Sequence, residues 1–488
     1  MGISPYAAIV IGSKNMLMKV YEISGGKGFR TVDEIRYEYE LGKEAYFTRK
    51  ITFAQIEEIC NVLMEFQQRM REYAITEFRC YATSAIRNAK NQVSVLNQIK
   101  IRTGVDVIML SNSELRFLMY KGIQVLDIDF NKIIEKNTAI LDIGTVKVRG
   151  FLESVENNVL DYISVLEEYI QYEFDMFKSG YLKDKDIKNV IAIGDEIKNI
   201  NRLIPELHLT DTMSYEQILY IYKKIKKASY QDIALKYGLS IEDARMVLPS
   251  VLIYKTFLER SKADTVYICA TNLCDGSVVD YAQETKKIKL SHDFYQDIVA
   301  SAKYIGKRYR YSKVHAQYIT DLALEIFDKT KKFHGLTQRD RLILEISAIL
   351  HDIGKYVNLN DPGKNGYQLI ISTEIMGLSH REREEVANIV LYNTQELPDT
   401  DELDTAFWRE EYLRIAKLSS ILRLANALDR GHKQKLEKCS MARKGKELII
   451  SLETNQDITL EITRFSKKAE TFSEFTGITP VLKQKRAL

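Results

Sequence analysis

Several features are scarce in this chain of 488 residues, which has five cysteines, six prolines and one tryptophan. The cysteines lack the paired spacing of a zinc site, so we expect reduced, buried thiols in a cytoplasmic protein. No apolar run reaches the ~18 residues that a membrane helix needs. The N-terminus lacks the basic start, apolar stretch and cleavage site of a signal peptide. We therefore expect no membrane partner.

Charge is also nearly balanced, at a formal +3, which is too small to favour nucleic acid or a membrane surface as partner. The basic run at residues 223–227 is typical of a solvated helix face. A hydrophobic content of 45% with 28% charged residues is ordinary for a globular protein. The length predicts three or four domains.

Strand and helix signals alternate through the first 290 residues. The apolar segments at 7–11 and 16–21 predict a hairpin, and residues 52–73 predict an amphipathic helix capped by Thr52. Further strands are expected at 77–82, 106–110, 189–194 and 263–269. Glycines follow strands at Gly12, Gly144 and Gly194, which indicates two related α/β lobes around a cleft.

The remainder changes character. Residues 292–437 read as helical almost throughout. After 447 the pattern returns to strands, and residues 448–452 and 458–462 predict a hairpin across the turn at 454–457.

The segment 139–148 comes close to a phosphate-binding loop. An apolar strand runs into Asp142, whose carboxylate could hold a divalent metal. Gly144 would let backbone N–H groups approach a phosphate. Val146, which is β-branched, stands where a further glycine would suit such a loop. The scaffold of a phosphate site is therefore predicted with altered chemistry.

Two other motifs carry candidate chemistry. Ser84 and Arg87, within residues 82–91, place a hydroxyl at a helix start and a guanidinium one turn later, which can bind an anion; Ser84 could equally be a helix cap. His351 and Asp352 form an adjacent pair that could ligate a divalent metal, with the distant His315 completing the set.

Residues 229–245 read as helix, glycine turn and helix, the pattern of a DNA-binding motif. Glu242 and Asp243 begin the second helix and would repel phosphates. A helical connection within a lobe is the alternative, and DNA is not expected as a partner.

The first half resembles the exopolyphosphatase and guanosine-pentaphosphate phosphohydrolase (Ppx/GppA) family. Residues 82–91 are similar to its Ala-Thr-Ser-Ala-Leu-Arg-x-Ala-x-Asn motif, and residues 8–15, 110–122 and 142–144 match other family motifs in order. The segment 349–355 and His315 resemble the HD phosphohydrolase domain that some members carry. There the ligand expected at Asn426 is an aspartate, and Asn365 and Asn393 stand where related sequences often have histidines.

The resemblance implies an α/β plus all-α fold. It has two actin-like (ASKHA, ribonuclease-H-like) lobes, an HD-type helical domain and a small C-terminal α+β domain. The corresponding ranges are 1–125, 126–290, 291–440 and 441–488. It also implies Mg²⁺ or another divalent metal, a homodimer, and inorganic polyphosphate or guanosine pentaphosphate (pppGpp) as partner.

The site residues implied by the resemblance fall into three groups. Glu114 would be catalytic, although Leu115 occupies the family's water-activating glutamate position. The phosphate-binding residues would be Gly12, Ser13, Ser84, Arg87, Gly144 and Lys147. The metal ligands would be Asp142, His315, His351 and Asp352.

Departures from the family pattern fall on the chemistry. Val10 replaces a metal-binding aspartate, Leu115 replaces the general base, residues 145–147 replace Gly-Gly-Ser, and Asp195 replaces a second glycine. A missing general base typically costs ~10²–10⁴-fold in rate. One hypothesis is weak or altered phosphohydrolase activity. The other is a catalytically inactive regulatory or scaffold protein that binds polyphosphate or a nucleotide, with the HD fold kept for structure.

Overall fold

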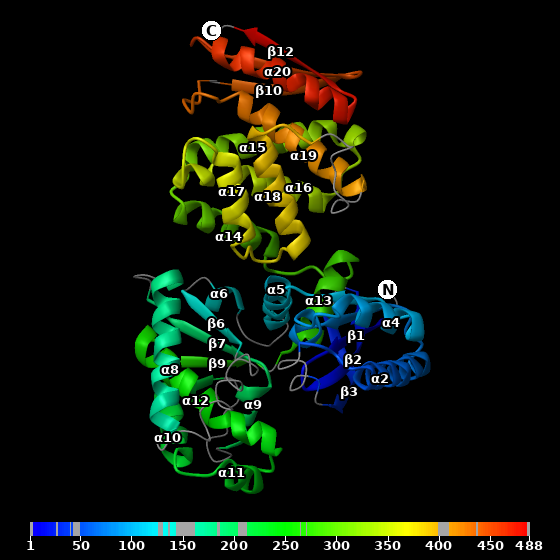
Figure 1. Cartoon of the computed structure of the whole chain (residues 1–488), viewed down its shortest axis with the longest axis vertical. Helices are drawn as coiled ribbons and strands as arrows, with labels where there is room; N and C mark the ends of the chain where they lie inside the picture. The colour runs from blue at the N-terminus through cyan, green and yellow to red at the C-terminus, as the bar shows by residue number, and fades with distance from the viewer. Residues whose placement is uncertain are drawn as a thin grey trace. The chain divides into compact units, whose positions relative to one another are not determined.

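The fold is described from a computed structural model of the chain, drawn in Figure 1. The chain divides into two compact units, residues 1–292 and 293–488, which we describe separately. The structure describes residues 3–25, 28–39, 41, 49–124, 130–134, 137–142, 162–182, 186–203, 212–263, 265–269, 271–398, 409–435 and 438–485.

The first unit begins with a five-stranded mixed sheet in the order β3-β2-β1-β4-β5. Its strands are β1 (Ile3–Ile11), β2 (Asn15–Ser24), β3 (Gly28–Glu38), β4 (Phe78–Ala82) and β5 (Val107–Met109). The first three strands pair antiparallel, which confirms the predicted hairpin, whereas β4 and β5 run parallel to β1. The carboxyl ends of β1, β4 and β5 therefore meet at one edge of the sheet.

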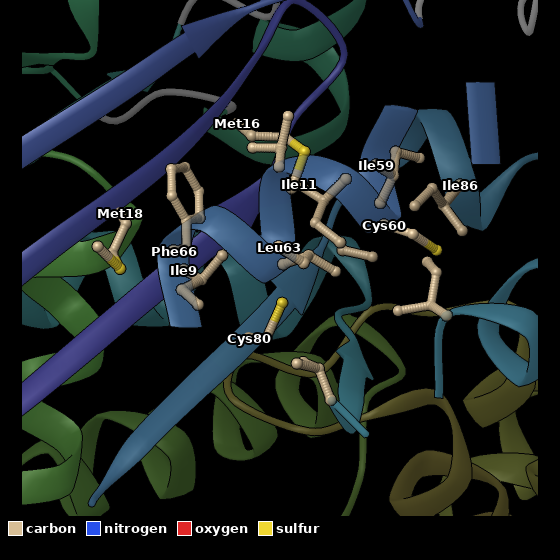
Figure 2. Close-up of a cluster of buried hydrophobic side chains, with 14 of the residues drawn as sticks. Ile9, Ile11, Met16, Met18, Ile59, Cys60, Leu63, Phe66, Cys80 and Ile86 are labelled. Carbon is tan, nitrogen blue, oxygen red and sulfur yellow. The ribbon is translucent and has the colours of Figure 1, made fainter. Parts of the chain in front are cut away.

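One face of this sheet packs against α2 (Phe53–Glu72) and α4 (Gln92–Thr103). Thr52 and Gln55 form the capping box of α2, which confirms the predicted helix start. Ile59, Leu63 and Phe66 lie at helical spacing and bury against the sheet, as Figure 2 shows. Fully burying such side chains contributes ~1.5–3 kcal/mol each, so this interface fixes the sheet that carries the site.

The other face packs against α13 (Leu273–Glu284), which crosses α5 (Asn112–Ile123). The Tyr6 hydroxyl lies 2.6 Å from Ser277 Oγ, and Lys19 Nζ donates to Asp275 at 3.2 Å. A Cβ on Gly276 would lie 1.9 Å from the Leu118 carbonyl oxygen, so only glycine permits this crossing. Although α13 falls in the range predicted for the second lobe, it packs on the first sheet.

The second sheet of this unit has the order β6-β7-β9-β8. Its strands are β6 (Thr138–Asp142), β7 (Asn189–Ile193), β8 (Thr212–Ser214) and β9 (Thr265–Cys269). The strands β6, β7 and β9 are parallel, and β8 is antiparallel to β9. Its associated helices include α6 (Phe130–Ile134), α8 (Tyr162–Phe177), α9 (Asp195–Arg202), α10 (Tyr215–Ile225), α11 (Tyr230–Tyr237) and α12 (Ile241–Ser261).

The predicted helix-turn-helix consists of α11, a left-handed Gly238 and α12. Ala244, Val247 and Val251 of α12 are buried in the core of this lobe. A recognition helix must present one face to a DNA groove, whereas residues 249–252 of α12, which point to all sides of the helix, are buried. The structure therefore agrees with a helical connection.

The second unit is helical up to Ala427. Its helices are α14 (Phe294–Arg308), α15 (Lys313–His334), α16 (Gln338–Leu350), the 3₁₀ turn η3 (Ile353–Tyr356), α17 (Pro362–Ile371), α18 (His380–Thr394) and α19 (Arg409–Ala427). Buried aliphatic side chains on α15, α16, α18 and α19 form its interior. This matches the expected helical region.

A three-stranded sheet in the order β10-β11-β12 follows (Figure 1). The helix α20 (Thr459–Thr476) connects β11 to β12 along the chain. The strands are β10 (Lys438–Lys444), β11 (Glu447–Glu453) and β12 (Thr479–Lys485). The predicted strand at 448–452 is confirmed, but it pairs with β10 and β12 and not with residues 458–462. The predicted strand at 458–462 is wrong, because this segment starts α20, where Phe465 and Phe472 bury at helical spacing.

The structure also tests what the sequence predicted of the cysteines and of membrane-spanning helices. Each of the five cysteines is free, and all except Cys439 are buried. Within the described ranges, we find no helix that combines the length and hydropathy needed to cross a membrane.

Candidate functional site

At the carboxyl edge of the first sheet, the first turn joins β1 to β2 through Gly12 and Ser13. The Gly12 N–H donates to the Asn15 carbonyl at 3.0 Å, and a Cβ on Gly12 would lie 2.8 Å from that same oxygen. The Tyr39 hydroxyl donates to the Gly12 carbonyl at 2.9 Å. These contacts hold the turn in a tight conformation that a larger residue would disturb.

The second turn at this edge follows β4 and contains Thr83 and Ser84. The Thr83 N–H donates to the Ile11 carbonyl at 3.2 Å, which ties this turn to the end of β1. Thr83 occupies the cap position of the short helix α3 (Ser84–Arg87), and Ser84 is its first residue. Ser84 therefore begins the helix without being its cap, and its half-buried hydroxyl can contact a ligand.

Arg87 connects the second turn to the third. Its Nη1 donates to the Leu110 carbonyl and its Nη2 to Asn112 Oδ1, both at 2.5 Å. The guanidinium thus bridges the ends of β4 and β5. A fixed guanidinium is a good anion ligand, but part of its donor set is already used within the chain.

The third turn begins α5 with a capping box. The Ser111 N–H donates to Glu114 Oε2 at 2.8 Å, and the Glu114 N–H donates to Ser111 Oγ at 3.2 Å. Leu115, the next residue, is half-buried. The Glu114 carboxylate therefore caps α5, and its hydrogen bond with the Ser111 N–H must break before it can act as a base.

At the carboxyl edge of the second sheet, Asp142 ends β6 level with Ile193 of β7. The next residue, Gly194, has φ +100°, a conformation that favours glycine, and precedes α9. The backbone of Asp142 is thus placed beside a strand-to-helix turn. The side chain of Asp142, together with Gly144 and Lys147, lies outside the described residues.

A second candidate site lies in the helical unit, where His315, His351 and Asp352 come together as the sequence predicted. His315 stands in the first turn of α15, and His351 and Asp352 directly follow α16. Their ligand atoms all lie within 4.8 Å of one another. Both imidazoles are buried.

Both imidazoles are held by their Nδ1 atoms. His315 Nδ1 lies 2.8 Å from Asp429 Oδ2, and His351 Nδ1 lies 2.7 Å from the Ala348 carbonyl oxygen. A carbonyl or an ionised carboxylate can only accept, so each Nδ1 carries the proton and each Nε2 presents a lone pair. This is the orientation that metal-ligating histidines adopt.

The two Nε2 atoms lie 3.2 Å apart. Two lone pairs at this distance repel unless a cation lies between them. Two nitrogens bound to one metal at ~2.05 Å with tetrahedral geometry would be about 3.3 Å apart. Asp352 Oδ1 is 3.6 Å from His351 Nε2, close enough for a third ligand after a small adjustment. The residues present therefore fit a mononuclear divalent metal.

A lysine lies on the other side of Asp352. Lys355 Nζ donates to Asp352 Oδ2 at 2.6 Å and lies 3.1 Å from His432 Nε2. The His432 ring stacks on His315 with centroids 3.6 Å apart. Lys355 thus supplies a fixed positive charge beside the ligand set, leaving Oδ1 of Asp352 for a metal.

The electrostatics favour deprotonated ligands. Burial lowers the pKa of His351, with His315 adding to the effect against the attraction of Asp352. Burial opposes ionisation of Asp352, but His351 and Lys355 outweigh it and lower its pKa to about 2. Burial, to which the nearby His315 and Lys355 add, lowers the pKa of His432 to about 4. Neutral imidazoles and a carboxylate are the forms that bind metal.

Comparisons with known proteins decide the family. Residues 19–125 match the profile of the Ppx/GppA phosphatase family, and residues 299–468 match that of Ppx/GppA phosphatase, domain III. Together these segments cover more than half of the chain. The chain belongs to the Ppx/GppA phosphatase family. The resemblance stated from the sequence is therefore confirmed.

Relatives and solved structures agree. The chain is 22% identical to a guanosine-5'-triphosphate,3'-diphosphate pyrophosphatase of Photobacterium profundum, over 86% of this chain and 87% of the relative. It is 20% identical to a protein of the same name from Vibrio campbellii, over 93% of each. The crystal structure of the Aquifex aeolicus family member matches with a TM-score of 0.51 at 18% identity, over 60% of this chain and all of that one. This likeness supports a fold with two mixed sheets and helices, as in actin-like lobes, and the domain III profile agrees with the mostly helical second unit.

Sequence reasoning missed three residues of the helical centre. Asp429, Lys355 and His432 contact the predicted ligands or each other. A lysine three residues after Asp352 could have been noticed, since both fall on one turn. Asp429 and His432 lie more than 110 positions from His315, and the packing of α15 against α19 brings them together. Asn426, the predicted replacement for a ligand, instead donates to Asn393 Oδ1 at 3.4 Å.

Proposed function

We propose that this protein removes the terminal phosphate of inorganic polyphosphate or of pppGpp, with activity that is weak or altered. The observation that carries the proposal is the joining of three turns at one sheet edge. Contacts of Thr83 with Ile11, and of Arg87 with Leu110, tie together the turns that hold the predicted phosphate-binding residues. The names of the relatives, which are similar along most of the chain, support the nucleotide as substrate.

In this proposal the chain's own groups bind and orient the phosphate. Ser84 would donate its hydroxyl, the Gly12–Ser13 turn would let the Ser13 N–H approach the phosphate, and Arg87 would contribute positive charge. Gly144 and Lys147 would complete the site, and a divalent metal at Asp142 would neutralise phosphate charge; these remain predictions. Positioned donors of this kind stabilise charge that develops as the terminal bond breaks.

The proton acceptor is the component that departs most from the family pattern. Leu115 cannot accept a proton, and the Glu114 carboxylate accepts the Ser111 N–H. For Glu114 to orient a water, it must leave the capping box. Losing a capping interaction costs ~0.5–2 kcal/mol. Weak turnover is therefore expected, because the reactive arrangement is populated for only part of the time.

A pair of substitutions at Glu114 tests this role. Glutamine also completes a capping box, so Glu114→Gln should keep the stability of α5 but abolish metal-dependent phosphate release. Glu114→Ala should lose both. Unchanged release by Glu114→Gln would reject Glu114 as the base. Leu115→Glu should raise turnover, if the edge is otherwise intact.

The alternative is a catalytically inactive protein that binds polyphosphate or a nucleotide in regulation or as a scaffold. The observation favouring it is that both groups already form hydrogen bonds within the chain. Glu114 Oε2 accepts from the Ser111 N–H, and Arg87 Nη1 donates to the Leu110 carbonyl. Calorimetric binding of pppGpp and polyphosphate, measured beside phosphate release, separates the two functions. Binding without release, in wild type and in Leu115→Glu alike, would favour the alternative. The homodimer implied by the resemblance remains a prediction, which light scattering tests.

A second metal site in the helical unit is also part of the proposal. His315, His351 and Asp352 would hold the ion, with Asp429 orienting His315. A divalent ion there could polarise a phosphate oxygen or lower the pKa of a bound water. We assign no reaction to this site, and its metal binding can be measured separately.

A further inference from the structure

A second group of polar side chains lies where α19 meets α20. Arg423 is 7% exposed, and its Nε has no hydrogen-bond partner. Within the ranges that the structure describes, its guanidinium also forms no ion pair. A buried, unpaired charge is costly, so its presence requires a reason.

The contacts between α19 and α20 fix which residues face each other. The Tyr412 and Phe475 rings are in contact, with centroids 6.3 Å apart, and Lys435, beyond the end of α19, pairs with Glu461 in the first turn of α20. The two helices therefore run antiparallel. Tyr412 marks the face of α19 that meets α20.

Helical periodicity extends this register. Ser419 and Arg423 lie about two and three turns after Tyr412, on the same face of α19. Lys468 and Arg464 lie about two and three turns before Phe475, on the matching face of α20. The antiparallel register thus sets Ser419 level with Lys468, and Arg423 level with Arg464.

The charges of this region are one-sided. Burial, together with the positive charges of Arg423, Lys467 and Arg464, lowers the pKa of Lys468 to about 8, against the carboxylate of Glu396. Burial also lowers the pKa of Arg423. Three cationic groups and one exposed carboxylate thus act on Lys468.

The unsatisfied atoms here can all donate. Besides Arg423 Nε, the buried Ser419 Oγ and Asn393 Nδ2 have no partner. Asn393 belongs to α18 and accepts from Asn426, which lies one turn beyond Arg423 on α19. Three donors without acceptors, in a positive region, suit a ligand that only accepts and carries negative charge. A phosphate group has both properties.

We propose that Ser419, Arg423 and Lys468, with Asn393, bind a phosphate group between α18, α19 and α20. The group is either free inorganic phosphate or the terminal phosphate of a longer anion. The low exposure of Arg423 favours a compact group at the guanidinium. The exposed Arg464 and Lys467 continue the positive charge outward along α20. The site shares no residue with the proposed phosphohydrolase site and stands or falls separately.

The test uses the full chain in phosphate-free buffer containing a chelator, which prevents turnover. In calorimetric titrations, wild type should bind inorganic phosphate and tripolyphosphate with one class of sites that Arg423→Met removes. Lys468→Gln should weaken the same class ~10-fold or more. Lys483→Gln, which removes an exposed lysine on β12, should leave it unchanged. Tighter binding of tripolyphosphate than of phosphate would identify the ligand as a chain end; equal binding would identify the free ion.

Thermal unfolding gives a second readout. Without phosphate, Arg423→Met should melt at a higher temperature than wild type, since methionine removes an uncompensated buried charge. Added phosphate should raise the melting temperature of wild type and leave that of Arg423→Met unchanged. Should Arg423→Met fail to fold, Lys468→Gln carries the comparison. The proposal is overturned if phosphate binds and stabilises wild type, Arg423→Met and Lys468→Gln equally, or binds none of them. Phosphate release by Lys468→Gln should match wild type, which separates this site from the catalytic proposal.

Discussion

Asp429 offers the sharpest test of the helical centre, because it contacts a predicted metal ligand without being one. Its carboxylate accepts from His315 Nδ1 at 2.8 Å, from Gln434 Nε2 at 2.6 Å and from the backbone N–H groups of Lys433 and Gln434. Every group around it is a donor. An asparagine at this position must turn its NH₂ toward one of them.

The size of the effect follows from this geometry. Asp429→Asn leaves at least one buried donor unpaired, which should cost ~1–3 kcal/mol of folding stability. It also loosens the hold on the His315 Nδ1 proton, so that Nε2 is less well aimed at the ion. Loss of such an orienting partner typically lowers metal affinity 10–100-fold, equivalent to about 1.4–2.7 kcal/mol. Removing a ligand outright, in His351→Ala, should lower affinity below detection.

The assay is a competition titration with Zn²⁺ and Mn²⁺ on protein stripped by a chelator, with metal content counted after dialysis. At this site we expect one equivalent in wild type, weaker binding in Asp429→Asn and none in His351→Ala. His380→Ala, which removes an exposed histidine at the start of α18, is the matched control and should behave as wild type. Circular dichroism verifies that each variant is folded.

Identical titrations of wild type and His351→Ala would refute the interpretation that the two Nε2 atoms, 3.2 Å apart, bind one metal ion. A proton shared by the two imidazoles would then explain that distance. If only Asp429→Asn matched wild type, the ligand set would stand. The orienting role of Asp429 would be rejected.

Two further predictions concern stability. Gly276→Ala would bring a Cβ within 1.9 Å of the Leu118 carbonyl oxygen, so we expect the free energy of unfolding in urea to fall by ~1–3 kcal/mol or more. The control is Gly180→Ala, whose Cβ would meet nothing within 4 Å and which should stay within about 0.5 kcal/mol of wild type. Equal effects of the two substitutions would refute the close helix crossing. Burial raises the pKa of Glu385 from 4.5 to about 7, against the effect of the nearby Arg414. Between these two pH values the folded state therefore holds a proton that the unfolded state has released. The free energy of unfolding should fall as pH rises from 4.5 to 7. Glu385→Gln should lack this fall and exceed wild type by ~1–3 kcal/mol at pH 8 but not at pH 4.5; parallel pH profiles would contradict it.

Sequence patterns predicted the elements whose signals are local. The capping box of Thr52 and Gln55 and the apolar stripe of α2 lie within one helix, and the start of α2 was predicted to within a residue. The start of α20 was predicted wrongly because Ile458, Leu460 and Ile462 alternate with polar residues, as in a half-buried strand. Only the longer spacing to Phe465 and Phe472 shows the helix.

The candidate sites divide in the same way. Ser84, Arg87, His351 and Asp352 stand in contiguous motifs, and the structure brings the last two together with the distant His315. The roles of the neighbouring groups depend on tertiary packing. No pattern around Asp429 shows that it contacts α15. Likewise, Arg423 reads as an ordinary helix residue until burial and the lack of a partner distinguish it.

The two sites of this chain differ in how their polar groups are used. At the edge of the first sheet, Glu114 and Arg87 form hydrogen bonds with the backbone of neighbouring turns. These bonds must break before the same atoms can contact a substrate or a water. In the helical centre, the bonds of His315 and His351 involve Nδ1 and leave both Nε2 atoms directed at a common point. Structural hydrogen bonds therefore oppose the proposed chemistry at the first candidate site and favour the proposed metal binding at the second. It follows that weak phosphate release and tight metal binding can coexist in this protein, and that neither measurement substitutes for the other.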